Sequence, residues 1–250
     1  MLQYFWILAP LFFFVSLLYS SVGLGGGSSY IALLCLFGIP LAKIPPLAFI
    51  FNILAASVAL YKFHEEKHIL PRLALPFLLA SVPATFFGAM WKPEERVLSL
   101  LFAAVLFSIS LMLLFTKKEV KPKRTLQKKT TWLLSLFLGG PIGFLGGLMG
   151  IGGGVLLGPV MLKIGMASPR QVICTCSVFV LVNSAAGLIF HFLQGGVEIS
   201  FVLLLGFAVL AGAQVGTSLS RKKLSFSLLQ RIFAILLLVV SFKLSFAVFQ

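Results

Sequence analysis

Long hydrophobic runs follow one another along the whole chain, and short polar or glycine-rich stretches separate them. Most runs approach the roughly 20 residues that an α-helix needs to cross a bilayer. The pattern predicts an all-α polytopic membrane protein with about ten hydrophobic helices. The runs cover residues 4–22, 27–38, 44–62, 70–90, 96–115, 132–149, 154–166, 172–192, 199–219 and 225–249.

Two of the runs, 27–38 and 154–166, are too short for a perpendicular crossing. Each begins in a glycine cluster and ends at a polar turn. We therefore expect short or broken helices after the glycine clusters. Three interpretations stay open: half-helices, re-entrant segments, and spans completed by unwound backbone.

The chain repeats itself at an offset of 127 residues, which aligns Gly23–His64 with Gly150–His191 without a gap. The glycine clusters coincide, Lys43 falls on Arg170, and a Phe-His pair ends both segments. This duplication predicts three parts: a first transmembrane repeat (1–115), a basic linker (116–131) and a second transmembrane repeat (132–250).

Composition supports the membrane assignment, because 60% of the 250 residues are hydrophobic and only 10% are charged. Soluble domains carry about 25% charged residues, so lipid must face much of this surface. The net charge of +14 would also suit a nucleic-acid-binding protein. However, seven of the 20 basic residues lie in the linker, and a basic loop between hydrophobic runs is typical of the cytoplasmic side. We expect no nucleic-acid partner.

Loop charges predict the topology. The basic loops 116–131 and 221–223 should be cytoplasmic. The loop 193–198 should be outside, whereas its counterpart 62–72 should be inside and 91–96 outside. Equivalent loops thus lie on opposite sides, which predicts five crossings per half, an inverted repeat and both termini outside. If the two short segments are re-entrant, the halves run parallel instead.

The glycine clusters are the first candidate binding site. Glycine-rich backbone inside a membrane survives where protein or a wet cavity covers it. A helix that begins after such a break points free N–H groups and its positive dipole end at the gap, which suits an anion. Close helix packing is the alternative explanation. The candidate residues are Gly25, Gly26, Gly27, Ser28 and Ser29 in the first cluster and Gly152, Gly153 and Gly154 in the second.

A second candidate group is a lining of uncharged polar side chains on later segments. Such donors can bind an anion without the cost of burying further charge. Each residue alone is equally consistent with hydrogen bonding between helices. The group consists of Asn52, Ser57, Thr175, Ser177, Asn183, Ser184 and Gln214.

Matched basic residues follow the short segments. Lys43 and Arg170 could attract anions to opposite mouths of a transport path, or simply extend toward the interface. His64 and His191 end matched segments and could couple transport to protons, although a place at the interface explains them as well.

The acidic residues are informative through their positions. The chain contains no Asp, and its six Glu residues all fall in loops or turns. A cation site or a carboxylate proton relay inside the membrane is therefore not expected. The sequence also shows no hydrolase triad and no cluster of metal ligands. We predict neither an enzyme nor a bound metal or cofactor.

At the glycine clusters the sequence resembles the TauE/SafE sulfite exporter family, also called TSUP. The resemblance rests on Gly23–Gly27 and Gly150–Gly154, each early in a half, with the basic linker between them, and it covers essentially the whole chain. The second cluster, with Gly158-Pro159 downstream, is the closer match; Ile31-Ala32 stand at the equivalent place in the first. The resemblance implies transport of sulfite, sulfoacetate, other organosulfonates or thiosulfate, with coupling to the proton gradient.

These features predict a secondary transporter in the inner cell membrane. It would export small sulfur-containing anions by alternating access between two inverted repeats. Uptake of thiosulfate or related anions by the same fold is one alternative, and a membrane scaffold or subunit without transport is another. The expected partners are the anion and the lipid bilayer; a homodimer is also compatible with the sequence.

Overall fold

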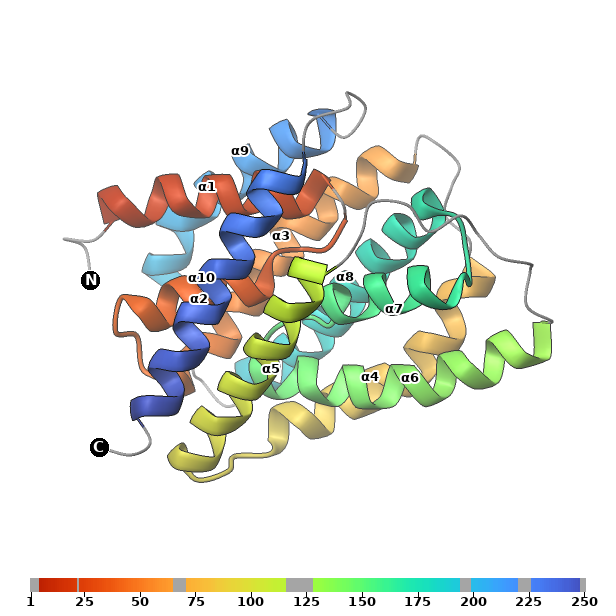
Figure 1. The fold of residues 1–250 in the computed structure, drawn as a ribbon, viewed down its shortest axis with the longest axis horizontal. Helices are drawn as coiled ribbons and strands as arrows, with labels where there is room; N and C mark the ends of the chain where they lie inside the picture. The colour runs from red at the N-terminus through yellow and green to blue at the C-terminus, as the bar shows by residue number, and fades with distance from the viewer. Residues whose placement is uncertain are drawn as a thin grey trace.

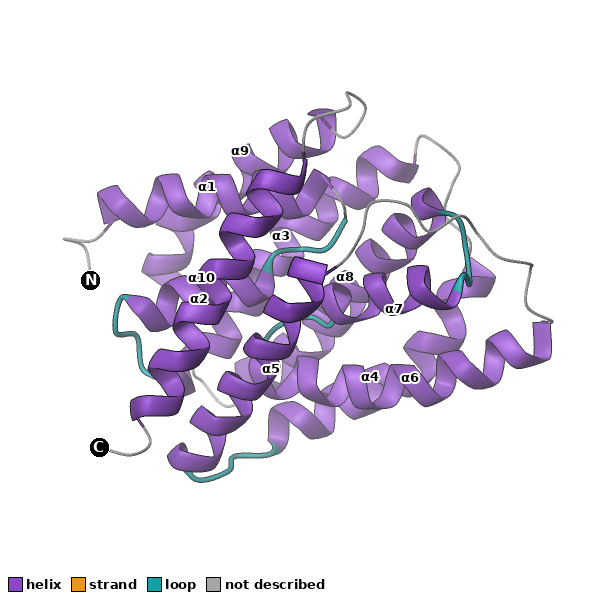
Figure 2. Ribbon diagram, in the orientation of Figure 1, coloured by secondary structure: helices purple, strands orange, loops and turns teal. Residues whose placement is uncertain are grey.

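The computed structural model describes residues 5–21, 23–64, 71–115, 128–193, 199–219 and 226–247, and these residues form ten α-helices and no strand (Figure 2). Each hydrophobic run corresponds to one helix, which confirms the all-α prediction. The helices are α1 (Phe5–Ser21), α2 (Gly27–Leu36), α3 (Ile44–His64), α4 (Pro71–Met90), α5 (Glu95–Phe115), α6 (Lys128–Met149), α7 (Gly154–Ile164), α8 (Pro169–Leu193), α9 (Ile199–Leu219) and α10 (Phe226–Ala247).

The structure describes a multi-pass membrane protein. Within the described residues, six helical stretches are long and apolar enough to cross a bilayer: 41–62, 72–90, 95–112, 130–149, 170–193 and 202–219. Large apolar side chains also point outward: Trp6, Phe137 and Phe207 are 81%, 77% and 75% exposed. Such exposure suits contact with lipid rather than with water.

Two helices begin three or four residues earlier than the hydrophobic runs that predict them. Helix α6 already starts at Lys128, so the last residues assigned to the linker are helical. Helix α8 starts at Pro169, where the fixed φ of proline suits the first helical position. Ser168 and Gln171 form a reciprocal capping box there, with bonds of 3.0 and 3.5 Å. Hydrophobicity does not detect these polar first turns.

The helices pack in pairs that join the two halves of the chain. Helix α1 packs along α9, α4 along α6, α3 along α8 and α5 along α10 (Figure 1). Under the 127-residue offset, α1 corresponds to α6 and α4 to α9, so the first two pairs are equivalent. The other two pairs each join a helix to its own counterpart. Reciprocal pairing of this kind is expected of a duplicated unit.

The packing divides the helices into two bundles, each drawn from both halves. The first bundle contains α1, α2, α3, α5, α9 and α10, and the second contains α4, α6, α7 and α8 (Figure 1). The bundles meet mainly where α3 packs on α8. The repeats therefore interleave instead of forming separate bodies.

Small residues let the paired helices approach closely. A Cβ atom added to Gly139 or Gly143 of α6 would lie 2.6 Å from the Phe77 carbonyl oxygen or 2.5 Å from that of Ser81, both on α4. Gly212 and Gly216 of α9 meet the α1 backbone in the same way. Glycines spaced four residues apart are the usual device for close helix packing in membranes.

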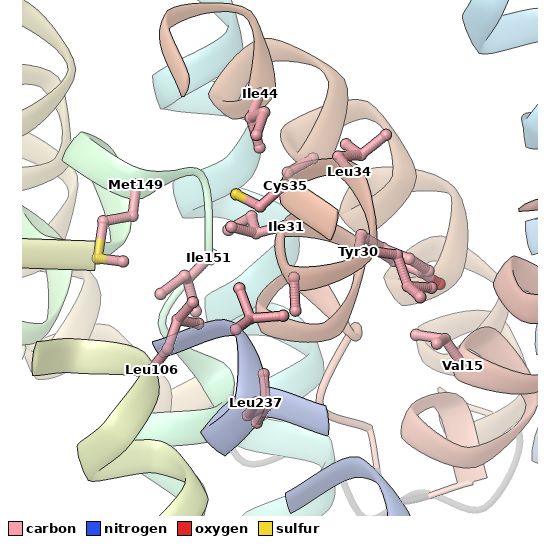
Figure 3. Packing of buried hydrophobic residues seen from close by; sticks show 14 of the residues in the cluster. Val15, Tyr30, Ile31, Leu34, Cys35, Ile44, Leu106, Met149, Ile151 and Leu237 are labelled. Atoms are coloured by element: carbon pink, nitrogen blue, oxygen red, sulfur yellow. The ribbon is translucent and has the colours of Figure 1, made fainter. Parts of the chain in front are cut away.

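Helix α2 lies in the interior of the molecule. All its residues from Gly27 to Cys35 are buried. Figure 3 shows Ile31 of this helix on the side of Ile151, which precedes α7, and of Leu106 of α5, while Val15 of α1 lies on the side of Tyr30. The short helix is thus shielded from lipid by both halves of the chain.

The α4–α6 packing gives a first testable prediction. Gly143→Ala should destabilise the protein by about 1–3 kcal/mol, because the new methyl group meets backbone atoms that cannot move aside. The control is Gly140→Ala, where a Cβ meets nothing within 4 Å. This control should be neutral or stabilising by up to about 1 kcal/mol, since alanine favours the helix. Thermal unfolding in detergent would measure both, and equal stabilities would contradict the packing.

Candidate functional site

The first glycine cluster forms a backbone break between α1 and α2. Gly23, Gly25 and Gly26 have φ values of +69°, +80° and +101°, a region that side-chain-bearing residues rarely adopt. The first helical bonds of α2 run from the N–H groups of Ser29 and Tyr30 to the Gly26 carbonyl oxygen, at 3.0 and 3.1 Å. The N–H groups of Gly27 and Ser28 come before these first donors and therefore have no partner within the helix, and no side chain caps it.

The second glycine cluster repeats this geometry between α6 and α7. Gly150, Gly152 and Gly153 have φ values of +81°, +71° and +77°. The N–H groups of Leu156 and Leu157 donate to the Gly153 carbonyl oxygen at 3.1 and 3.0 Å, again without a side-chain cap. The two clusters therefore have positive φ values at the same three matched positions.

The two breaks meet, and we call the place where 23–27 and 150–154 come together the glycine crossing. A Cβ atom on Gly27 would lie 2.6 Å from the Ile151 carbonyl oxygen, and one on Gly154 would lie 3.4 Å from that of Leu24. Leu24 and Ile151 are matched positions, so the contact is reciprocal. Helices α2 and α7 thus begin against each other's preceding loop.

Asn52 of α3 contacts both breaks. Its side chain is fully buried, and Nδ2 donates a hydrogen bond to the Gly150 carbonyl oxygen at 3.0 Å. Its Oδ1 atom would lie 3.1 and 3.0 Å from Cβ atoms built on Gly25 and Gly27, and it has no hydrogen-bond partner. One amide therefore connects the second break to the first and keeps an unused acceptor there.

Buried hydroxyl groups without a partner accompany this amide. Ser28 on the first turn of α2 is fully buried, and so is Ser184 of α8, whose Oγ would lie 2.8 Å from a Cβ on Gly152. Thr175 of α8 is also buried with an unbonded hydroxyl, but on the side of that helix opposite to Ser184. An unsatisfied buried polar group costs about 1–3 kcal/mol, so these side chains favour a ligand that bonds to them.

Other predicted residues use their hydrogen bonds within the fold. Ser29 Oγ donates to Tyr19 Oη at 2.9 Å. Ser177 Oγ lies within bonding distance of the Ile173 and Gly23 carbonyl oxygens, at 3.0 and 3.3 Å. Ser177 therefore ties α8 to the first break.

Asn183 also uses both polar atoms of its amide within the fold. Its Oδ1 accepts from Thr85 at 2.9 Å and its Nδ2 donates to the Phe179 carbonyl oxygen at 2.9 Å. Thr85 also lies 2.9 Å from the Gly143 carbonyl oxygen, so this network holds α4, α6 and α8 together.

The remaining predicted residues lie away from the glycine crossing. Ser57, Gln214, Lys43 and Arg170 have exposed side chains. His191 is half-buried beside the ring of Phe49, and its Nε2 atom is buried with no hydrogen-bond partner. The side chain of His64 lies outside the described part of the structure.

Three contributors escape the sequence analysis: Tyr19, Thr85 and Val180. Val180 Cγ1 would lie 2.8 and 3.2 Å from Cβ atoms on Gly25 and Gly152, so it packs against both breaks. An apolar residue gives no sequence signal for such a place. Thr85 could have been found, because Ser81 and Thr85 are buried hydroxyls one turn apart on an otherwise apolar helix.

The electrostatics of the site come from backbone dipoles. Among the described residues, the buried polar side chains are those of serine, threonine, asparagine and tyrosine, and none of these is charged. The same residues contain no group of metal-ligating side chains. The positive ends of α2 and α7 therefore supply the field at the glycine crossing. At the other end of α2, the Lys243 ammonium lies 3.4 and 3.3 Å from the Cys35 and Leu36 carbonyl oxygens.

Comparison with known proteins identifies the family. The family model described as "Sulfite exporter TauE/SafE" matches residues 8–244. "Probable membrane transporter protein y4hK" of Sinorhizobium fredii is 30% identical over 240 residues, which cover 95% of this chain and 96% of that protein. "Probable membrane transporter protein YunE" of Bacillus subtilis is 26% identical over 194 residues, or 70% of each chain.

A plant protein shares a shorter region. "Sulfite exporter TauE/SafE family protein 1" of Arabidopsis thaliana is 43% identical over 77 residues, which cover 29% of this chain and 17% of the plant protein. No solved structure matches the chain significantly. The family match spans both glycine breaks and nearly all described helices, and on this ground the chain belongs to the TauE/SafE family of membrane transporters.

Proposed function

We propose that this protein is a secondary transporter that exports small sulfur-containing anions, such as sulfite or organosulfonates, across the inner membrane. The observation that carries the proposal is the glycine crossing, where two helix starts meet beside unbonded polar atoms. The printed name of the plant relative, a sulfite exporter family protein, supports the choice of substrate.

The glycine crossing offers what an oxyanion requires. The free N–H groups at the start of α2 are donors, and the hydroxyls of Ser28 and Ser184 can donate as well. No buried carboxylate of the described residues would repel the anion. An anion here would gain hydrogen bonds that the protein alone leaves unmade.

Alternating access would move the two mixed bundles against each other. Two hydrogen bonds join the bundles at the glycine crossing: Asn52 to Gly150 and Ser177 to Gly23. Each links a flanking helix of one bundle to the break of the other. Relative rocking of the bundles would break these bonds, and a bound anion could compensate for their loss. The direction of net transport then follows the gradients.

Flux measurements test this function directly. Purified protein in proteoliposomes should carry labelled sulfite or an organosulfonate faster than empty vesicles. Gly27→Ala should lower the flux by about 5- to 150-fold, because its methyl group meets the Ile151 carbonyl oxygen and the Asn52 amide at 2.6 Å each, a clash worth about 1–3 kcal/mol.

The matched control for flux is Gly140→Ala, which adds the same methyl group in open space. It should transport like the original protein. A folded protein that carries none of several sulfur oxyanions would contradict transport and favour the scaffold alternative.

The membrane orientation is a further part of the proposal. The basic linker 116–131 would be cytoplasmic, and the repeats would be inverted with both termini outside. Reporter fusions at residues 66 and 196, in matched loops outside the described residues, should report opposite sides of the membrane. The same side for both positions would rule out the inverted arrangement.

Proton coupling is assigned to His191. Its Nε2 atom is buried without a hydrogen-bond partner, so protonation of the imidazole would change which hydrogen bonds the side chain can form. His191→Gln should retain anion flux driven by the anion gradient but lose the acceleration caused by an imposed pH gradient. His68→Gln serves as the control, since His68 lies in the predicted loop. An unchanged response of the His191 variant to the pH gradient would remove His191 from the coupling mechanism.

A further inference from the structure

The glycine crossing contains no ionised side chain to balance a bound anion. Within the described residues, each buried polar side chain is neutral, and Lys43 and Arg170 are exposed. The cost of desolvating an ion in a medium of low polarity grows with the square of its charge. A dianion would therefore cost about four times as much as a monoanion, and the same two helix dipoles would have to offset it.

The unbonded oxygen of Asn52 adds a second constraint. Nδ2 is held by the Gly150 carbonyl oxygen at 3.0 Å, so the amide cannot turn over without placing two oxygens against each other. Oδ1 therefore stays directed at Gly25, in the first break, and at Gly27, the first residue of α2. This atom only accepts hydrogen bonds, and a fully deprotonated oxyanion would repel it.

From these two features we propose that the site selects singly charged sulfur anions that carry their own hydrogen-bond donor. Hydrogensulfite and hydroxyl-bearing sulfonates have this character, whereas sulfate and sulfoacetate are dianions at neutral pH. The sulfonate oxygens would accept from the N–H groups of Gly27 and Ser28 and from the Ser28 hydroxyl. The donor of the anion would bond to Asn52 Oδ1. This selectivity rests on the transport function proposed above.

The test compares three labelled anions of similar size in the same proteoliposomes. Isethionate is a monoanion with a hydroxyl group, propane-1-sulfonate has a methyl group in place of that hydroxyl, and sulfoacetate has a carboxylate in place of the whole hydroxymethyl group. Isethionate should be carried with about tenfold higher kcat/KM than propane-1-sulfonate, which reflects one hydrogen bond to an otherwise unbonded acceptor. Sulfoacetate should be the poorest substrate.

Variants locate the selectivity. Asn52→Leu removes the acceptor and should bring the ratio of isethionate to propane-1-sulfonate close to one. Ser57→Ala lies on the same helix with an exposed side chain and should keep the original ratio. The ratio is measured within each preparation, so a loss of folded protein does not change it. The ranking in the unaltered protein stands even if Asn52→Leu fails to fold.

The outcomes separate this inference from the transport function. If propane-1-sulfonate is carried as well as isethionate, or sulfoacetate is carried best, the selectivity is overturned while transport of sulfur anions stands. If the Asn52→Leu variant keeps the original ratio, Asn52 is not the acceptor and the inference fails. If no sulfur anion is carried at all, the transport function itself is overturned.

Discussion

Backbone that leaves the helical conformation inside a bilayer must be covered by protein, and here each glycine break is covered by the other. Carbonyl oxygens of Leu24 and Ile151 lie against the starts of the opposite short helices. Each exposed polar group would otherwise cost several kcal/mol in lipid. The contact requires glycine at 27, since a Cβ there would lie 2.6 Å from the Ile151 carbonyl oxygen, whereas a Cβ on Gly154 would meet the side chain of Val180. The arrangement of α3 and α8 on either side follows from this contact.

This constraint also explains why the repeats interleave. If each half had packed as a separate body, its break would have faced lipid or its own helices. Instead α1 packs along α9 and α6 along α4, which places the two breaks back to back in the interior. Helix α2 can then be short, because both halves shield it. The bonds from Asn52 to Gly150 and from Ser177 to Gly23 become contacts between bundles, where a change of bound ligand can act on both.

The sequence predicts the helices well and the site residues less well. Hydrophobic runs mark the helices because lipid demands apolar side chains, and the glycine clusters mark the breaks because few residues adopt positive φ. The polar residues were harder to place. Ser57 and Ser184 are matched in sequence, yet one is exposed and the other is fully buried. In helices that are apolar on every side, periodicity does not show which face points inward. Packing between distant segments decides it.

The duplication is symmetric in the backbone and asymmetric in the side chains. Asn52 corresponds to Phe179, and Ser28 corresponds to Val155, so the acceptor and one hydroxyl belong to the first half alone. A fully symmetric site would present identical groups from both sides and suit a symmetric ion. A sulfonate or a protonated oxyanion has a charged end and a donor end, which require different partners. Because the side chains around the glycine crossing differ between the halves, the two ends of such an anion meet different surroundings. The backbone contact on which the fold depends stays the same.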